Sequence, residues 1–134
     1  MERVFVDTDV CLDLLSGRKP FSMFAERLFS LSDLKKVEIC VSSLSFSNID
    51  YVLHSTYANS EIRRQIAAFK SIVTTLAVDS YIIDLALTSD FADFEDAIQY
   101  YTAVQNQISV LITRNIKDYK HAQIQVVTPE MYLS

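Results

Sequence analysis

The chain has 134 residues, half of them hydrophobic, and a formal net charge of −5 at pH 7. This length and composition are typical of one compact domain, so we expect a single domain over residues 1–134. The charge argues against a protein that wraps nucleic acid with a broad basic face, because Lys and Arg contacts to phosphates supply most of such affinity. A group of acids that binds divalent cations would weaken this objection, because bound cations reverse the local charge.

The sequence lacks the motifs of several classes of protein, and their absence excludes those classes. No opening stretch resembles a signal peptide and no apolar run approaches the roughly 18 residues of a membrane span, so we expect a cytoplasmic protein without a membrane partner. The only glycine is Gly17, which excludes Gly-rich phosphate loops and serine-hydrolase elbows. Cys11 and Cys40 lie in apolar segments and not at zinc-ligand spacing. We therefore assign the cysteines no chemistry.

Hydrophobic spacing along the chain alternates between the patterns of strands and of helices. Short apolar runs predict buried strands, and apolar residues at every third or fourth position predict helices. In chain order, the predicted elements are a strand over residues 3–6, helices over residues 10–15 and 20–36, a strand over residues 37–41, helices over residues 42–54 and 60–75, a strand over residues 76–78, helices over residues 79–87 and 94–106, strands over residues 110–113 and 124–127, and a final turn from residue 129.

Residues at the ends of these segments support the assignment. Gly17 is suited to end the first helix, and Pro20 to begin the second. Ser42 or Ser43 is a suitable N-cap for one later helix, and Asp79 or Ser80 for another. Strands that alternate with helices predict an α/β fold, which we expect to be a three-layer α/β/α sandwich around a mainly parallel sheet of four or five strands.

Acidic and polar residues follow two of the predicted strands. Ligands of parallel sheets bind beyond the carboxyl ends of the strands, so residues at these positions are candidates for a site. Asp7 and Asp9 follow the strand over residues 3–6. The residues that follow the apolar run 110–112 are Thr113, Arg114 and Asn115, with Asp118 in the turn beyond.

A third acidic group begins the helix over residues 94–106. Asp93 and Asp96 are three residues apart, so they share one helical face. An ordinary structural role is open to each of them, because an N-cap and favourable partners of the helix dipole are often acidic. Mg²⁺ and Mn²⁺ prefer carboxylate oxygens. The convergence of three acidic groups thus predicts a metal site, to which Asp7, Asp96 and Asp118 can supply the ligands.

Three motifs carry a resemblance to a known family. Residues 4–10 read Val-Phe-Val-Asp-Thr-Asp-Val, residues 96–98 read Asp-Ala-Ile with Ala103 beyond, and residues 113–119 read Thr-Arg-Asn-Ile-Lys-Asp-Tyr. These resemble the opening motif, the late acidic helix and the closing Thr-Arg-Asn-x-x-Asp-Phe pattern of PIN-domain nucleases, with Tyr119 in the last place. Such proteins are found as toxins in prokaryotic toxin-antitoxin operons of the VapBC type, and the resemblance runs nearly end to end.

The resemblance implies a ribonuclease that hydrolyses RNA phosphodiester bonds with Mg²⁺ or Mn²⁺. Asp7, Asp96 and Asp118 would be the catalytic residues and would bind the metal, with Asp93 and Asn48 as further candidate ligands. It also implies a homodimer and a small antitoxin protein that covers the acidic groove. The remaining site residues fall into two groups. Those that would orient a ligand or a water molecule are Asp9, Thr113 and Asn115; those that would contact substrate phosphates are Arg114, Lys117 and Lys120, for which a solvated surface role is the alternative.

One position departs from the family pattern and keeps other functions open. Many members have a metal-binding Glu early in the helix after the second strand, where this chain has Asn48. Asn48 can ligate through its carbonyl oxygen or hold a water molecule, and Asp93 or Glu95 can compensate for the lost acid. A degenerate module that binds RNA or protein without catalysis is therefore one alternative.

A second alternative comes from the opening motif alone. Residues 7–10 also resemble the opening of haloacid-dehalogenase-type phosphatases, in which Asp7 would be the nucleophile and Asp9 the acid and base. That family has a late Gly-Asp or Asp-Asp motif and a phosphate-binding Lys. The chain is short for that fold and has no glycine besides Gly17, so the phosphatase is the weaker hypothesis.

Overall fold

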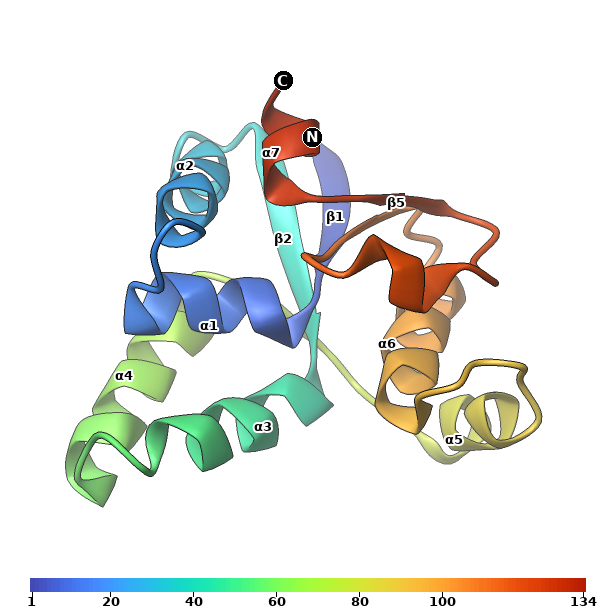
Figure 1. The fold of residues 1–134 in the computed structure, drawn as a ribbon, viewed down its shortest axis with the longest axis horizontal. Coiled ribbons are helices and arrows are strands. Elements are labelled where there is room, and N and C mark those ends of the chain that lie inside the picture. Colours follow the sequence, from blue (N-terminus) through green and yellow to red (C-terminus); the bar gives the residue numbers. More distant parts are fainter.

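The computed structural model describes residues 1–134, and a parallel sheet lies at its centre (Figure 1). The strands are β1 (Glu2–Val6), β2 (Val37–Ser42), β3 (Thr74–Leu76), β4 (Val110–Ile112) and β5 (Gln125–Val127). Their order across the sheet is β3-β2-β1-β4-β5, and every neighbouring pair is parallel. The predicted α/β fold with a parallel sheet is confirmed.

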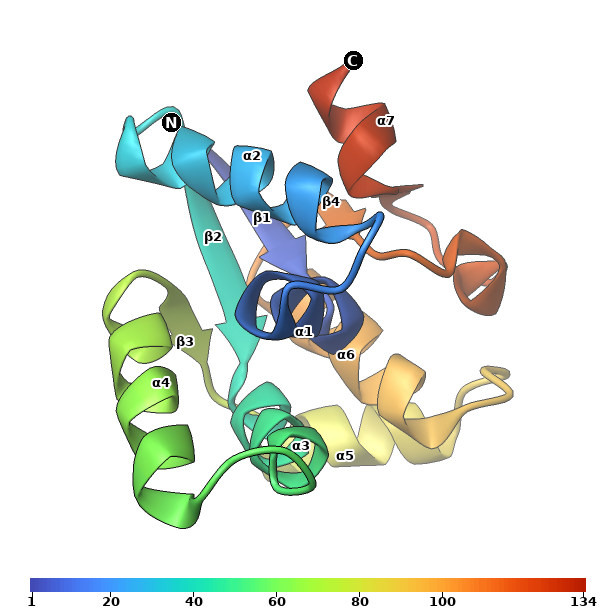
Figure 2. The ribbon, with the colours of Figure 1, turned by 60° about the vertical axis from the view of Figure 1, so that its left-hand side comes forward.

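Helices cover both faces of this sheet, which gives three layers (Figures 1 and 2). One layer comprises α1 (Thr8–Ser16), α2 (Ser22–Asp33), α3 (Ser43–Leu53) and α4 (Asn59–Ser71). On the opposite face lie α6 (Phe94–Gln105) and the 3₁₀-helix η1 (Ile116–Tyr119), with α5 (Ser80–Leu87) packed on α6, while α7 (Pro129–Leu133) packs on α2. None of these helices has both the length and the apolar character needed to cross a membrane.

The two faces of the sheet are filled by alternate residues of its strands. Val4 and Val6 pack into the core beneath α1 to α4, whereas Phe5 packs into a separate core with Tyr100 and Tyr119 on the α6 side. This alternation follows from the two-residue period of a strand. Full burial of a Val or Phe side chain contributes roughly 1.5–3 kcal/mol, so β1 is anchored from both sides.

Strand β3 lies earlier in the chain than the sequence indicated. It comprises Thr74–Leu76, and α4 ends at Ser71, whereas the predicted helix continued to residue 75 and the predicted strand covered residues 76–78. The β-branched residues 73–75 favour a strand over a helix. Residues 74–76 also pair with residues 40–42 of β2, which fixes their register.

The sheet is built outward from the central strand β1, first on one side and then on the other. It proceeds from β1 to β2 and β3, and then returns to place β4 on the other side of β1. The backbone N–H of Asp7 donates to the carbonyl of Ile112 at 2.9 Å, so the ends of β1 and β4 are joined. In such sheets the crevice where the strand order reverses is the usual place for a ligand.

Candidate active site

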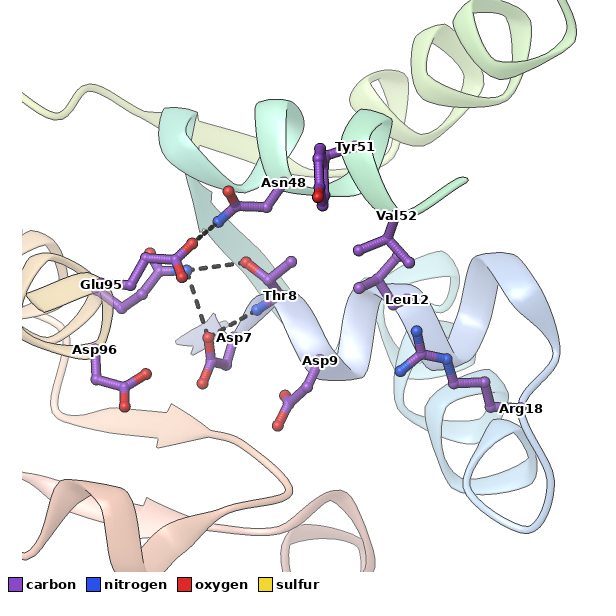
Figure 3. A pocket seen from close by; sticks show the side chains of 11 residues that line it. Asp7, Thr8, Asp9, Leu12, Arg18, Asn48, Tyr51, Val52, Glu95 and Asp96 are labelled. Carbon is purple, nitrogen blue, oxygen red and sulfur yellow. Dashed lines mark hydrogen bonds between the residues drawn. The ribbon is translucent and has the colours of Figure 1, made fainter. Parts of the chain in front are cut away.

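A cavity of about 300 Å³ opens at this carboxyl edge of the sheet (Figure 3). It lies between α1, α3 and the first turns of α6. Its lining includes the acids Asp7, Asp9, Glu95 and Asp96, and one basic residue, Arg18. Two of the three predicted metal ligands therefore meet in one cavity.

Asp7 is the most firmly held of these acids. It is 8% exposed and lies directly after β1, where it caps α1. Its Oδ1 accepts hydrogen bonds from Thr8 N at 2.8 Å and Gln99 Nε2 at 3.4 Å, and its Oδ2 accepts from the hydroxyls of Thr113 and Tyr119, each at 2.9 Å. Burial raises the pKa of Asp7, and the donors oppose this shift less strongly.

Asp96 reaches the same point from the first turn of α6. The hydroxyl oxygen of Tyr119 lies 3.5 Å from Asp96 Oδ1, so this one hydroxyl is close to both Asp7 and Asp96. Burial, followed by the nearby charges of Asp7, Asp93 and Asp118, raises the pKa of Asp96 to about 7. Asp93 itself caps the helix, because its Oδ1 accepts from the backbone N–H of Asp96 at 3.0 Å.

Asp9 fixes the loop that follows β4. Its Oδ2 accepts from the Thr113 hydroxyl at 3.2 Å, the backbone N–H of Arg114 at 3.1 Å and the side-chain amide of Asn115 at 3.3 Å. Its other oxygen, Oδ1, is buried without a partner. Burial, followed by the charge of Asp7, raises the pKa of Asp9 to about 7. The hydroxyl of Thr113 thus contacts both Asp7 and Asp9.

Asp118 lies outside the cavity lining. It is exposed on η1, but its charge is near enough to raise the pKa of Asp96. Lys117 and Lys120 are likewise exposed. No three acidic, histidine or cysteine side chains are placed to enclose one ion together. Asp7 and Asp96 form the centre of the site, and Asp118 lies beside it.

Arg114 is directed away from this cavity. Its Nε lies 2.9 Å from Asp13 Oδ2, and its guanidinium carbon lies 4.1 Å from the ring centroid of Phe21. It lines a second, smaller cavity of about 200 Å³ with these two residues. The predicted phosphate contact would require Arg114 to leave a buried ion pair, whereas Arg18 already lines the acidic cavity.

Two residues of the site were not found from the sequence. Gln99 is 2% exposed, and its Nε2 lies 3.1 Å from the hydroxyls of both Thr8 and Ser45. A signal for it exists, because Gln99 is a polar residue in a buried run and shares a helical face with Asp96, three positions earlier. Arg18 gives no such signal, because it follows Gly17 in an irregular connection.

The acids of the site make stability depend on pH. The folded pKa of Asp96, about 7, lies above its ordinary value of 3.8, so the folded state binds its proton more tightly than the unfolded state does. Stability from this group is therefore present below pH 4 and is lost as pH rises towards 8. Asparagine cannot ionise, so Asp96→Asn should lose less stability than wild type as the pH rises. We expect the difference to be about 1–2 kcal/mol in the free energy of unfolding, because solvent screens the charge of a half-buried group.

This expectation is checked by urea unfolding in EDTA at pH 5.5 and pH 8. The free energy of unfolding should fall less between these pH values in Asp96→Asn than in wild type. Asp50→Asn removes an exposed carboxylate on α3 that does not line the acidic cavity, and it serves as the control. An equal fall in wild type and Asp96→Asn would contradict the expectation.

In three dimensions the chain is similar to several solved structures. FitAcB from Neisseria gonorrhoeae aligns with a TM-score of 0.73 and 15% identity, over 95% of this chain and 98% of that one. A toxin-antitoxin complex from Klebsiella pneumoniae gives 0.70 and 22%, over 94% and 97%. VapC20 of Mycobacterium tuberculosis, described as a sarcin-ricin loop cleaving toxin, gives 0.69 and 14%, over 91% and 98%. These likenesses show a shared fold.

The family is shown by the sequence itself. No curated protein matches the chain. The family profile described as PIN domain, however, matches residues 3–117. The matched region begins in β1 and ends in η1, so it contains both Asp7 and Asp96. The chain belongs to the PIN domain family.

Proposed function

We propose that this protein is a metal-dependent ribonuclease that hydrolyses RNA phosphodiester bonds, and that it is the toxin of a toxin-antitoxin pair. The observation that carries the proposal is the meeting of Asp7 and Asp96 in one cavity, close to a single tyrosine hydroxyl. Membership of the PIN domain family supports it. So does the similarity in fold to a protein described as a sarcin-ricin loop cleaving toxin.

The oxygen atoms of the cavity fit a hard divalent cation such as Mg²⁺ or Mn²⁺. Mg²⁺ in proteins usually takes one or two carboxylates and keeps several water molecules, which the pair Asp7 and Asp96 would satisfy. Burial, followed by the like charge of Asp7, raises the pKa of Asp96, and a cation would relieve the repulsion between the two acids. Asp118 would assist from η1, and Asn48 could contribute an amide oxygen. When bound, such a cation supplies an activated water and neutralises phosphate charge.

The chain's own residues orient this site and meet the substrate. Thr113 and Tyr119 hold Asp7 from the side of the protein core, while Asp9 fixes the loop after β4. These contacts keep the carboxylates in place before any ligand arrives, which reduces the reorganisation needed during reaction. Arg18 lines the same cavity and is suited to contact a phosphate of the RNA.

The proposal includes two protein partners. A small antitoxin would cover the acidic groove, and the toxin itself would form a homodimer. The support for an antitoxin is that similar chains occur in a toxin-antitoxin complex from Klebsiella pneumoniae and in VapBC from Salmonella typhimurium, the latter with 18% identity and a TM-score of 0.69. The homodimer is inferred from the family resemblance alone, and light scattering of the purified protein tests it.

A degenerate binding module is the alternative that specific features favour. The family resemblance implies an acid at the position of Asn48, and no three acids are already placed around one ion. The phosphatase hypothesis has no comparable support, because the chain belongs to the PIN domain family.

Cleavage of a panel of structured RNAs tests the proposal directly. We expect cleavage with Mg²⁺ or Mn²⁺, none in EDTA, and recovery when the metal is restored. Calorimetry with Mn²⁺ measures binding on the same preparation. If the protein neither cleaves RNA nor binds Mn²⁺, the nuclease proposal fails and the degenerate module is supported.

A further inference from the structure

Aromatic side chains surround a cavity that the proposed chemistry does not use. This cavity has a volume of about 480 Å³ and lies between α6, the loop after α5 and the loop after η1, which meet at one edge of the molecule (Figures 1 and 2). Its aromatic walls are Phe91, Tyr100, Tyr101 and His121, and we call it the aromatic cavity. The ring centroid of Phe91 lies 5.1 Å from that of Tyr100, 6.4 Å from that of Tyr101 and 6.2 Å from that of His121. Phe91 is therefore the centre of the group.

The walls of the aromatic cavity are attached to the scaffold of the fold. The hydroxyl of Tyr100 accepts a hydrogen bond from the backbone N–H of Gln123 at 3.0 Å, which joins the loop after η1 to α6. Tyr100 is buried in the core, whereas Tyr101 is half-buried and His121 is exposed. The latter two side chains can therefore contact a ligand. A concave site of this size with aromatic walls and a few polar groups is suited to a flat organic group.

The polar residues of the aromatic cavity favour a nucleobase over a phosphate. Asp90 and Gln123 are exposed and line the cavity. The Asp90 carboxylate accepts hydrogen bonds and repels a phosphate, while the Gln123 amide both donates and accepts. Unpaired RNA bases are recognised by stacking on aromatic side chains and by hydrogen bonds at their edges. The aromatic cavity offers both kinds of contact.

One side chain connects the aromatic cavity to the acidic site. The ring centroid of Phe91 lies 6.0 Å from that of Tyr119, and the Tyr119 hydroxyl donates to Asp7 at 2.9 Å. Lys117 and Lys120 are exposed on η1 and directly after it. An RNA strand with one phosphate at the acidic site can therefore place a nearby base in the aromatic cavity, with its backbone close to these lysines.

We infer that the aromatic cavity binds one unpaired base of the RNA substrate. The base stacks on Tyr101 and His121, and its edge contacts Asp90 and Gln123. Double-stranded RNA does not present its bases in this way, so the cavity selects single-stranded segments. This inference rests on the proposed function, because it assigns a substrate contact to the proposed ribonuclease.

Fluorescence anisotropy of a labelled RNA tests the inference. The probe is a short single-stranded RNA of mixed sequence, and the same sequence annealed to its complement is the comparison. Binding is measured in EDTA, so that cleavage does not consume the probe, and at low salt, because phosphate contacts weaken as salt rises. We expect Tyr101→Leu and His121→Ala each to raise the Kd for the single strand by about 5- to 100-fold, the range for one stacked base. The Kd for the duplex should not change.

Each variant has a matched control outside the aromatic cavity. Tyr81→Leu changes a tyrosine of α5 that is 58% exposed, and His54→Ala changes an exposed histidine directly after α3. Both controls should bind the single strand like wild type. Thermal unfolding identifies any variant that has lost its fold. His121 is exposed, so His121→Ala should unfold like wild type even if Tyr101→Leu does not.

Several results would overturn the inference. Folded variants that bind the single strand like wild type would do so, as would controls that weaken binding equally. Equal weakening for the duplex would show a contact to the backbone and not to a base. Unchanged RNA binding with a loss of self-association in light scattering would make the cavity a protein contact. A wild-type protein that does not bind the single strand would also overturn it.

The cleavage assay separates this inference from the proposed function. Cleavage by wild type, together with unchanged binding by both folded variants, would overturn the inference and leave the ribonuclease intact. Binding that depends on Tyr101 and His121 without any cleavage would overturn the ribonuclease. The aromatic cavity would then be the RNA site of a binding module.

Discussion

Asp7→Asn should abolish metal-dependent RNA cleavage without unfolding the protein. Asp7 accepts four hydrogen bonds and stands beside Asp96 at the end of the central strand, so it is the residue on which the geometry of the site depends. Asparagine has nearly the same shape but no charge to hold a cation. We expect a loss of at least about 10²- to 10³-fold in rate, the range measured when one preorganised group that stabilises charge is removed.

Single-turnover cleavage measures this loss, with wild type and variant purified identically. Burial disfavours the charged form of Asp7, which raises its pKa, so the neutral asparagine should not reduce the free energy of unfolding in EDTA. Asp50→Asn is the matched control and should cleave RNA at the wild-type rate. Cleavage by Asp7→Asn at the wild-type rate would remove Asp7 from the active site and would indicate a copurifying nuclease.

Arg114→Ala should be strongly destabilising and should affect folding more than catalysis. The guanidinium of Arg114 is paired with Asp13, which is 1% exposed, and packs over the ring of Phe21. Burial raises the pKa of Asp13, and the charge of Arg114 opposes that shift. Removing Arg114 leaves a buried carboxylate without its cation, which costs about 3–5 kcal/mol in other proteins.

Urea unfolding at pH 7.5 measures the change in the free energy of unfolding. Lys117→Ala removes an exposed basic residue of the same loop and should change this free energy by less than about 0.5 kcal/mol. Asp13→Asn added to Arg114→Ala should restore part of the loss, since the buried charge is then gone. If Arg114→Ala instead raises KM for RNA at unchanged stability, the residue contacts phosphate as the sequence indicated.

The sequence predicted the architecture because strand and helix patterns are local. The apolar run at residues 4–6 has the composition of a buried strand, and the helix period in residues 94–106 follows from apolar spacing alone. Asp7 could be placed at the edge of the sheet by the same logic, because it comes directly after a buried strand. The register of β3 could not be placed in this way, since it depends on pairing with residues 40–42 of β2.

The sequence by itself thus determined the parallel α/β fold and the place of Asp7 at the edge of the sheet, because strand ends follow from local composition. Only the tertiary structure decided which partners the side chains have. Arg114 is paired with Asp13, Tyr119 reaches Asp7, and the amide of Asn48 holds Glu95. These contacts join residues far apart in the chain. In such contacts the direction of a side chain depends on the burial and charge of its spatial neighbours, which cannot be read from a local sequence pattern.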